Sequence, residues 1–131
     1  MINYSCAMND ETPIIDVCVL YVTVPDIQTA KTLATALLED RLAACVNILP
    51  AMTSVYRWEG AIESGEEVSM IVKTTKARAP AARETILRIH PYETPAVLCL
   101  SVDPLASSKA FCEWVASETQ RPAEDQTPQL A

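Results

Sequence analysis

The chain has 131 residues, of which 50% are hydrophobic and 21% are charged. This balance is typical of one globular domain with a buried core, and it excludes a disordered chain. The net charge of −7 and the scattered placement of ten Lys and Arg argue against nucleic acid and anionic membranes as partners, and no apolar run approaches the ~20 residues of a membrane-spanning helix.

The two ends of the chain are predicted to lie outside the folded domain. Residues 1–13 are polar and irregular, and they lack the basic start and apolar stretch of a signal peptide. We therefore expect a disordered N-terminal extension and a cytoplasmic protein. Residues 122–131 contain prolines and show no periodicity, which predicts a disordered tail. The domain is thus predicted to span residues 14–121.

A strand and a helix are predicted first. Residues 16–24, DVCVLYVTV, form a nearly continuous apolar and β-branched run, which is typical of a strand buried on both faces. Pro25 ends this strand, and Asp26 is a favourable N-cap. Apolar residues then recur at helical spacing, which predicts a helix over residues 26–40.

A long hairpin is predicted next. Residues 43–59 form a strand-like run in which Pro50 cannot donate to the ladder and therefore marks a bulge or an edge. Residues 63–66, ESGE, are predicted to form a turn. Residues 66–75, EEVSMIVKTT, then return as a second strand antiparallel to the first.

A helix, a strand and a last helix complete the chain. Residues 77–90 are predicted to be helical, with Pro80 in the first turn. Residues 96–102, AVLCLSV, predict a fourth strand. Ser107 or Ser108 is expected to cap the last helix, whose inward-facing side chains are predicted to be Phe111, Trp114 and Val115.

This order of elements predicts an α+β fold. Strand, helix, two strands, helix and strand, joined by right-handed crossovers, give the ferredoxin-like βαββαβ sandwich, in which two helices cover one face of an antiparallel sheet. The long hairpin of the second and third strands and the extra C-terminal helix are additions to it. Many unrelated activities use this fold, so the fold alone does not predict a function.

The hairpin is too long for a single copy of this sheet. At ~3.3 Å per residue, residues 43–59 would span more than ~50 Å, well beyond a typical strand. Its far part carries Met52, Val55, Tyr56 and Trp58. Exposed apolar strands are liabilities unless they pair, so we expect a closed homo-oligomer in which each arm extends a neighbour's sheet. The alternative is a twisted hairpin that folds back on its own sheet.

The cysteines are expected to be reduced thiols. There are five, an odd number, and they are widely spaced without a CxxC pair. Cys18, Cys45 and Cys99 lie in apolar strand-like runs, which predicts that they are small core residues.

Six segments together resemble a known family. They are TVPD before the first helix, LAACVNILP, TSVYRWEG, EEVSMIVKTT, the HPYETP loop and a late tryptophan, Trp114. In this order, over about residues 16–119, they resemble the CutA family of divalent-cation tolerance proteins. The resemblance implies a ferredoxin-like subunit, a tight homotrimer and an association with copper and other divalent metals. It also implies likeness to the PII signal proteins, trimers that bind small ligands in clefts between subunits.

His90 is the only histidine, and it precedes Pro91. A residue before proline avoids the α region, so the helix should end near Ile89, where a histidine can cap the last carbonyls. As a metal ligand it lacks partners, because a structural Zn²⁺ site needs four protein ligands. Some similar bacterial proteins carry a cysteine and a second histidine where this chain has Val22 and Ile89. We therefore expect weak binding of Cu²⁺ or another divalent cation at His90, and no organic cofactor.

A second candidate site combines Trp58, Glu67, Lys73, Tyr92 and Glu93. Glu67 and Lys73 are an even number of residues apart on one predicted strand, so both should point to the same face. Lys73 has apolar neighbours and should be near a carboxylate. Tyr92 and Glu93 lie in a loop stiffened by prolines. The five could line a ligand cleft between subunits, or Glu67 and Lys73 could form a structural ion pair in the trimer.

The first hypothesis for function is a trimeric, non-enzymatic divalent-cation (copper) tolerance protein with weak metal binding. The alternative is a PII-like signalling module that binds a small molecule or a partner protein in its intersubunit clefts. Catalysis is less favoured, because two glycines cannot form a glycine-rich phosphate loop and no nucleophile motif is present. Proton transfer by Tyr92 and Glu93 is the remaining catalytic alternative.

Overall fold

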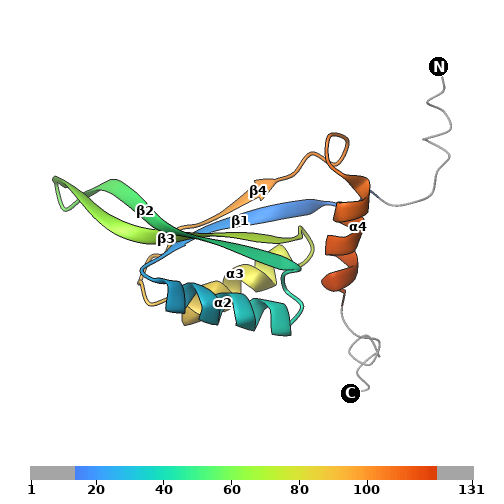
Figure 1. Ribbon diagram of the computed structural model, residues 1–131, viewed down its shortest axis with the longest axis horizontal. Coiled ribbons are helices and arrows are strands. Elements are labelled where there is room, and N and C mark those ends of the chain that lie inside the picture. Colours follow the sequence, from blue (N-terminus) through green and yellow to red (C-terminus); the bar gives the residue numbers. More distant parts are fainter. Residues whose placement is uncertain (1–13, 121–131) are drawn as a thin grey trace.

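The computed structural model describes residues 14–120, which form one antiparallel sheet with two helices on one face (Figure 1). The elements are β1 (Val17–Val24), α2 (Ile27–Glu39), β2 (Cys45–Trp58), β3 (Ala61–Thr75), α3 (Ala79–Ile89), β4 (Val97–Ser101) and α4 (Lys109–Glu118). The strand order is β2-β3-β1-β4, so β2 and β4 are the edge strands. The predicted ferredoxin-like α+β fold is confirmed. The extensions predicted for residues 1–13 and 122–131 lie outside the described residues.

The main core lies between the sheet and the helices α2 and α3. Alternate side chains of a strand share a face, and on β1 Leu20 and Val22 point toward the helices and are buried, whereas Tyr21 between them is partly exposed. The prediction that this strand is buried on both faces is therefore wrong for one chain, in which the second face is only partly buried. The predicted N-cap of α2 is confirmed, because Asp26 Oδ1 accepts the backbone N–H of Thr29 at 2.7 Å. No helix in the described part of the chain is long and apolar enough to cross a membrane.

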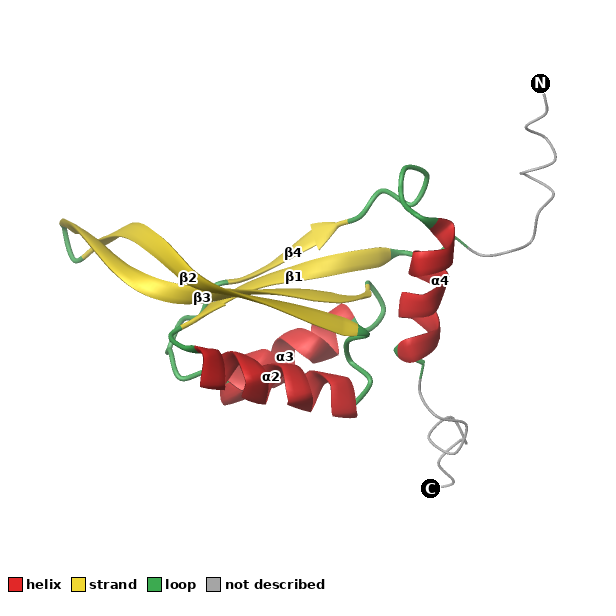
Figure 2. Cartoon of the chain, viewed as in Figure 1, coloured by secondary structure: helices red, strands yellow, loops and turns green. Residues whose placement is uncertain are grey.

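The β2–β3 hairpin extends beyond the helices and does not fold back on its own sheet (Figure 2). Its strands have 14 and 15 residues. The turn lies at Glu59 and Gly60, whose φ angles of 48° and 85° are positive at both central positions, as a two-residue type I′ turn requires. The turn predicted at residues 63–66 is wrong, since those residues lie inside β3 and pair with β2.

The bulge predicted at Pro50 is confirmed. The register between β2 and β3 shifts between Leu49 and Met52, and Ala51 adopts a φ of 62°. Proline has no N–H to donate, so the ladder is interrupted at this point in any case. The left-handed conformation is strained for alanine, because its Cβ approaches the following carbonyl oxygen.

We expect Ala51→Gly to stabilise the protein. Glycine adopts positive φ without the steric cost, which is roughly 1 kcal/mol for an L-residue, although its greater freedom in the unfolded chain offsets part of the gain. Urea denaturation should show a higher midpoint for this variant. Ala61→Gly is the matched control, because Ala61 lies in β3 without a positive φ, and it should lower the midpoint. A lower midpoint for Ala51→Gly as well would contradict the assigned strain.

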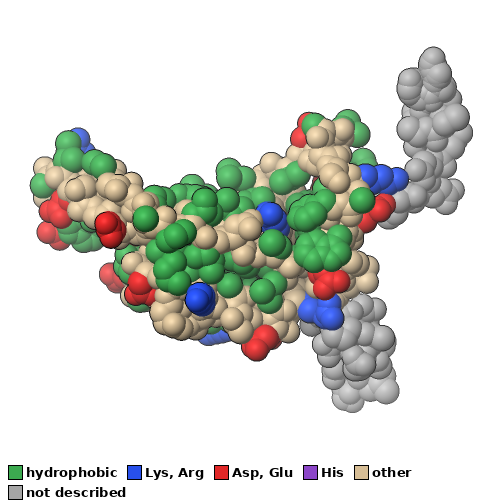
Figure 3. Space-filling model, viewed as in Figure 1, with side chains coloured by type: hydrophobic (Ala, Val, Ile, Leu, Met, Phe, Trp, Pro, Cys, Tyr) green, Lys and Arg blue, Asp and Glu red, His purple; other side chains and the backbone are tan. Residues whose placement is uncertain are grey.

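The sheet face opposite the helices, here called the outer face, is incompletely covered in one chain. In the antiparallel register Leu98 pairs with Tyr21, and Leu100 pairs with Val19. Leu98 and Leu100 are 59% and 54% exposed. Figure 3 shows hydrophobic side chains at the surface across the middle of the molecule and near the end of the hairpin. Exposed apolar side chains gathered in this way are typical of an interface.

The last helix, α4, lies at one end of the sheet. Ser108 caps it, its Oγ accepting the backbone N–H of Phe111 at 3.3 Å. Val115 is buried as predicted, but Phe111 and Trp114 are 42% and 43% exposed, so the prediction that they face inward is wrong for one chain. The prediction that Cys99 is a core residue is also wrong, because it is exposed on the edge strand β4.

Candidate functional site

His90 stands at the C-terminal end of α3, and its side chain forms a hydrogen bond to β1. Its backbone N–H donates to the carbonyl of Ile86 at 2.8 Å, and its extended ψ of 137° stops the helix where the sequence predicts. The imidazole is 6% exposed. Its Nε2 lies 2.8 Å from the carbonyl oxygen of Thr23. Since a carbonyl can only accept, Nε2 carries the proton, and Nδ1 accepts the backbone N–H of Tyr92 at 3.1 Å.

These two hydrogen bonds decide what His90 can offer a metal ion. A neutral imidazole has one lone pair, at Nδ1, and the Tyr92 N–H occupies it. The other nitrogen donates to a backbone carbonyl, which is the usual orientation of a metal-binding histidine. Within residues 14–120 no group of three or more His, Cys, Asp or Glu side chains is placed to hold a metal. The residues around His90 therefore do not form a ready-made metal site.

Glu67 and Tyr92 meet, as the second candidate site requires. Tyr92 OH donates to Glu67 Oε2 at 3.3 Å, and the Ser54 hydroxyl donates to Oε1 at 2.7 Å. Partial burial raises the pKa of Tyr92, and the negative charge of Glu67 raises it further. The phenol therefore keeps its proton and acts as a donor to the carboxylate at neutral pH.

The other predicted members of this site lie elsewhere in the chain. Lys73 is six residues from Glu67 on β3, which is ~20 Å along a strand, and its Nζ lies 5.3 Å from the centre of the Phe111 ring. In the described part of the chain the sole salt bridge joins Arg83 and Glu84, so Lys73 makes no ion pair there. Trp58 pairs with Ala61 beside the hairpin turn and is 58% exposed.

Glu93 lies exposed in the loop after α3, next to Tyr92. One chain therefore brings together Glu67 and Tyr92. It leaves Trp58 and Lys73 at opposite ends of the hairpin. Sequence reasoning missed Ser54. Its position depends on the bulge in β2, which sets the register that brings it to Glu67.

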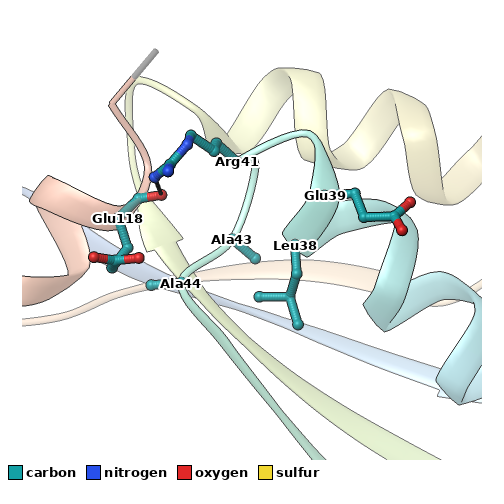
Figure 4. Close-up of a pocket in the computed structure, with 6 residues that line it drawn as sticks. All are labelled: Leu38, Glu39, Arg41, Ala43, Ala44 and Glu118. Atoms are coloured by element: carbon teal, nitrogen blue, oxygen red, sulfur yellow. Dashed lines mark hydrogen bonds between the residues drawn. The ribbon is translucent and has the colours of Figure 1, made fainter. Parts of the chain in front are cut away.

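A separate small pocket, of about 250 Å³, lies where the C-terminal ends of α2 and α4 approach each other (Figure 4). Arg41 Nη1 donates to the backbone carbonyl of Glu118 at 3.1 Å across it. The last carbonyls of a helix have no partner within the helix, and a basic side chain that donates to them stabilises the helix end. None of the predicted site residues lines the pocket, and we assign it to the joining of the two helices.

Comparison with known proteins decides the family. The family described as CutA1 divalent ion tolerance protein matches residues 18–118. The chain belongs to the CutA1 family. It is 40% identical over 102 residues to the divalent-cation tolerance protein CutA of Thermus thermophilus, which covers 77% of this chain and 96% of that relative.

Solved CutA1 structures agree with the fold. The Thermus thermophilus protein superposes with a TM-score of 0.75 at 38% identity, covering 79% of this chain and 99% of that one. CutA1 from Oryza sativa gives a TM-score of 0.77 at 34% identity, covering 83% and 98%. The mouse Protein CutA is 41% identical over 100 residues, and the chain spans about half the length of this relative, 55%. The resemblance predicted from the six segments is confirmed.

Proposed function

We propose that this CutA1 chain acts in the cytoplasm as a homotrimer in divalent-cation tolerance, copper included, and binds rather than transforms its ligands. The observation that supports it most directly is the uncovered outer face of the sheet, where Leu98 and Leu100 are exposed on β4, together with a hairpin that extends past its own helices. A single copy leaves this apolar surface in water, and further copies would bury it. The two unpaired sheet edges, β2 and β4, give each copy a strand to donate and a strand to receive.

The trimer is tested by the mass of the native protein. Native mass spectrometry at micromolar concentration should give three times the chain mass of 14.3 kDa. Light scattering after gel filtration should give the same value without the transfer to the gas phase. A monomer by both methods would refute the proposal.

The metal contacts in this proposal are weak and centre on His90. The reason is a competition: a divalent cation gains the Nδ1 lone pair only if the Tyr92 N–H gives it up. One imidazole without a preassembled set of carboxylates or thiols is a poor match for Cu²⁺, which prefers several nitrogen or oxygen ligands. Tyr92 lies in an exposed loop whose N–H can turn to water, so the exchange is physically available.

A PII-like ligand cleft is the second candidate function, and the Glu67–Tyr92 contact favours it. The exposed Tyr92 and Glu93 stand beside a fixed carboxylate, and a neighbouring copy could add Lys73 or Trp58 to the same place. Thermal-shift screening of nucleotides, small carboxylates and metals tests it. A ligand of the cleft should raise the melting temperature of the wild type and have less effect on Glu67→Gln. If no compound shifts the wild type, the cleft is structural.

A further inference from the structure

Two thiols lie together on the helix side of the sheet, away from both candidate sites. In the register of β1 and β4, Cys18 pairs with Ser101, and Cys99 pairs with Leu20. Cys18 and Cys99 are therefore diagonal neighbours on one face, within reach of each other across adjacent strands. Burial, and then the neighbouring Cys99 thiol, raises the pKa of Cys18 to about 12. In one chain Cys18 is buried, whereas Cys99 is exposed.

A second observation at the same place points to a charged partner. Thr74 lies directly opposite Cys18 on β3 and is completely buried. Within residues 14–120 its Oγ1 has no hydrogen-bond partner, and an unpaired buried hydroxyl costs stability. A thiolate accepts a hydrogen bond far better than a neutral thiol does. The hydroxyl makes no hydrogen bond to the neutral Cys18 thiol, and an ionised sulfur on this paired residue would be a stronger acceptor for it.

Lys76 supplies the opposing charge. It follows Thr74 by two residues, just after the end of β3. Its positive charge acts to lower the pKa of Cys18 against the effect of burial. The thiol pair thus has a hydroxyl donor and a cation near it. A positive ion bound between the two sulfurs would favour the ionised form of both thiols.

The number of protein ligands at this place determines which metal ion can bind. Zn²⁺ needs about four protein ligands, and no group of three or more His, Cys, Asp or Glu side chains gathers anywhere in the described chain. Two soft thiolates without further donors suit a monovalent soft ion, Cu⁺, in two-coordinate geometry. A hard or divalent ion would remain short of ligands here.

We propose that Cys18 and Cys99 form a two-coordinate Cu⁺ site on the helix side of β1 and β4, with Thr74 donating to the Cys18 sulfur. Each thiol releases one proton to solvent, two copper–sulfur bonds form, and the copper stays in its monovalent state. This goes beyond the divalent-cation role proposed above and does not depend on the trimer, because both thiols come from one chain and lie opposite the outer face.

The test uses Cu⁺ alone, under anaerobic conditions and with a reductant that contains no thiol. The parent protein carries Cys6→Ser and Cys45→Ser, which remove thiols outside the pair, and it should withdraw one copper per chain from the coloured Cu⁺–bicinchoninate complex. Adding Cys99→Ser should weaken this binding by more than the ~10-fold typical of losing an outer-shell partner. Adding Cys112→Ala instead is the matched control and should leave copper binding unchanged, because Cys112 packs in the separate cluster with Val17 and Val115.

A second variant separates binding from folding. Thr74→Val keeps the shape of the side chain but removes the unpaired hydroxyl, so the metal-free protein should melt at a higher temperature and yet bind Cu⁺ more weakly. Circular dichroism confirms that each variant is folded. Absence of copper uptake by the parent, or equal uptake by the Cys99→Ser and Cys112→Ala variants, overturns the site. Unchanged Cu⁺ affinity in Thr74→Val overturns the role of the hydroxyl.

Discussion

Replacing Leu98 with aspartate is expected to convert the proposed homotrimer into monomers and to lower the melting temperature. Leu98 is 59% exposed on the outer face of an edge strand, and full burial of a leucine side chain is worth ~1.5–3 kcal/mol at each copy of an interface. The aspartate would lose this burial and would place three negative charges in the interface, each of which costs several kcal/mol when it is unpaired and desolvated. Gel filtration with light scattering measures the change.

The matched control is Leu87→Asp. Leu87 is 42% exposed on α3, in the helix layer on the other side of the sheet. This substitution introduces the same charge and removes the same side chain, and it should leave the mass at three chains. If both variants stay trimeric, the outer face is not the interface. If both variants dissociate, the added negative charge causes the dissociation wherever it is placed, and the result does not identify the outer face as the interface.

The sequence predicts the elements of this fold well because their periodicity is local. The apolar spacing in α2 and the N-cap at Asp26 identify a helix without any knowledge of its neighbours. Pro50 identifies a bulge for the same reason, since a residue without an N–H interrupts any ladder. Residues 63–66 predict a turn because they contain a glycine in a polar stretch. Glu59 and Gly60 also contain a glycine, and they form the real turn. Their positive φ values distinguish the two places, and composition does not report φ.

The burial of the outer face could not be predicted, because it depends on what covers it. Phe111 and Trp114 have the spacing of a buried helix face, yet one chain leaves both partly exposed. Their spacing correctly indicates an apolar helix face, but no surface in the described part of the chain fully covers this face. Lys73 shows the same difficulty: its predicted carboxylate partner is absent from its surroundings in the described chain, where it contacts an aromatic ring.

The intersubunit cleft stays a prediction, but one chain does bring two of its residues together. Glu67 and Tyr92 are hydrogen-bonded, although they are 25 residues apart in the sequence. The even number of residues between Glu67 and Lys73 predicts that both side chains lie on the same face of the strand. It does not bring them close together along the strand. A shared face is a weak criterion on a strand of 15 residues, because side chains at its two ends share a face and never meet.

Replacing His90 with alanine is expected to lower the free energy of unfolding by roughly 2–3 kcal/mol, through lost packing and two broken hydrogen bonds. The imidazole is buried and bridges Thr23 at the end of β1 to Tyr92 in the loop after α3. Without it, the Thr23 carbonyl loses its partner inside the protein, while the Tyr92 N–H can turn to water. Urea denaturation measures the loss. His90→Gln should recover part of it, because the amide can donate to the Thr23 carbonyl.

Copper titration of the same variants separates the structural role of His90 from the proposed metal contact. The glutamine variant keeps a hydrogen-bond donor but has no imidazole lone pair, so it should be close to wild type in folding and should lose the weak Cu²⁺ binding. If Cu²⁺ binds His90→Gln as it binds the wild type, the cation uses other ligands, and the histidine serves the fold alone. A tight Cu²⁺ complex in the wild type would also contradict the competition between the metal and the Tyr92 N–H, because one ligand that must first break a hydrogen bond cannot supply such affinity.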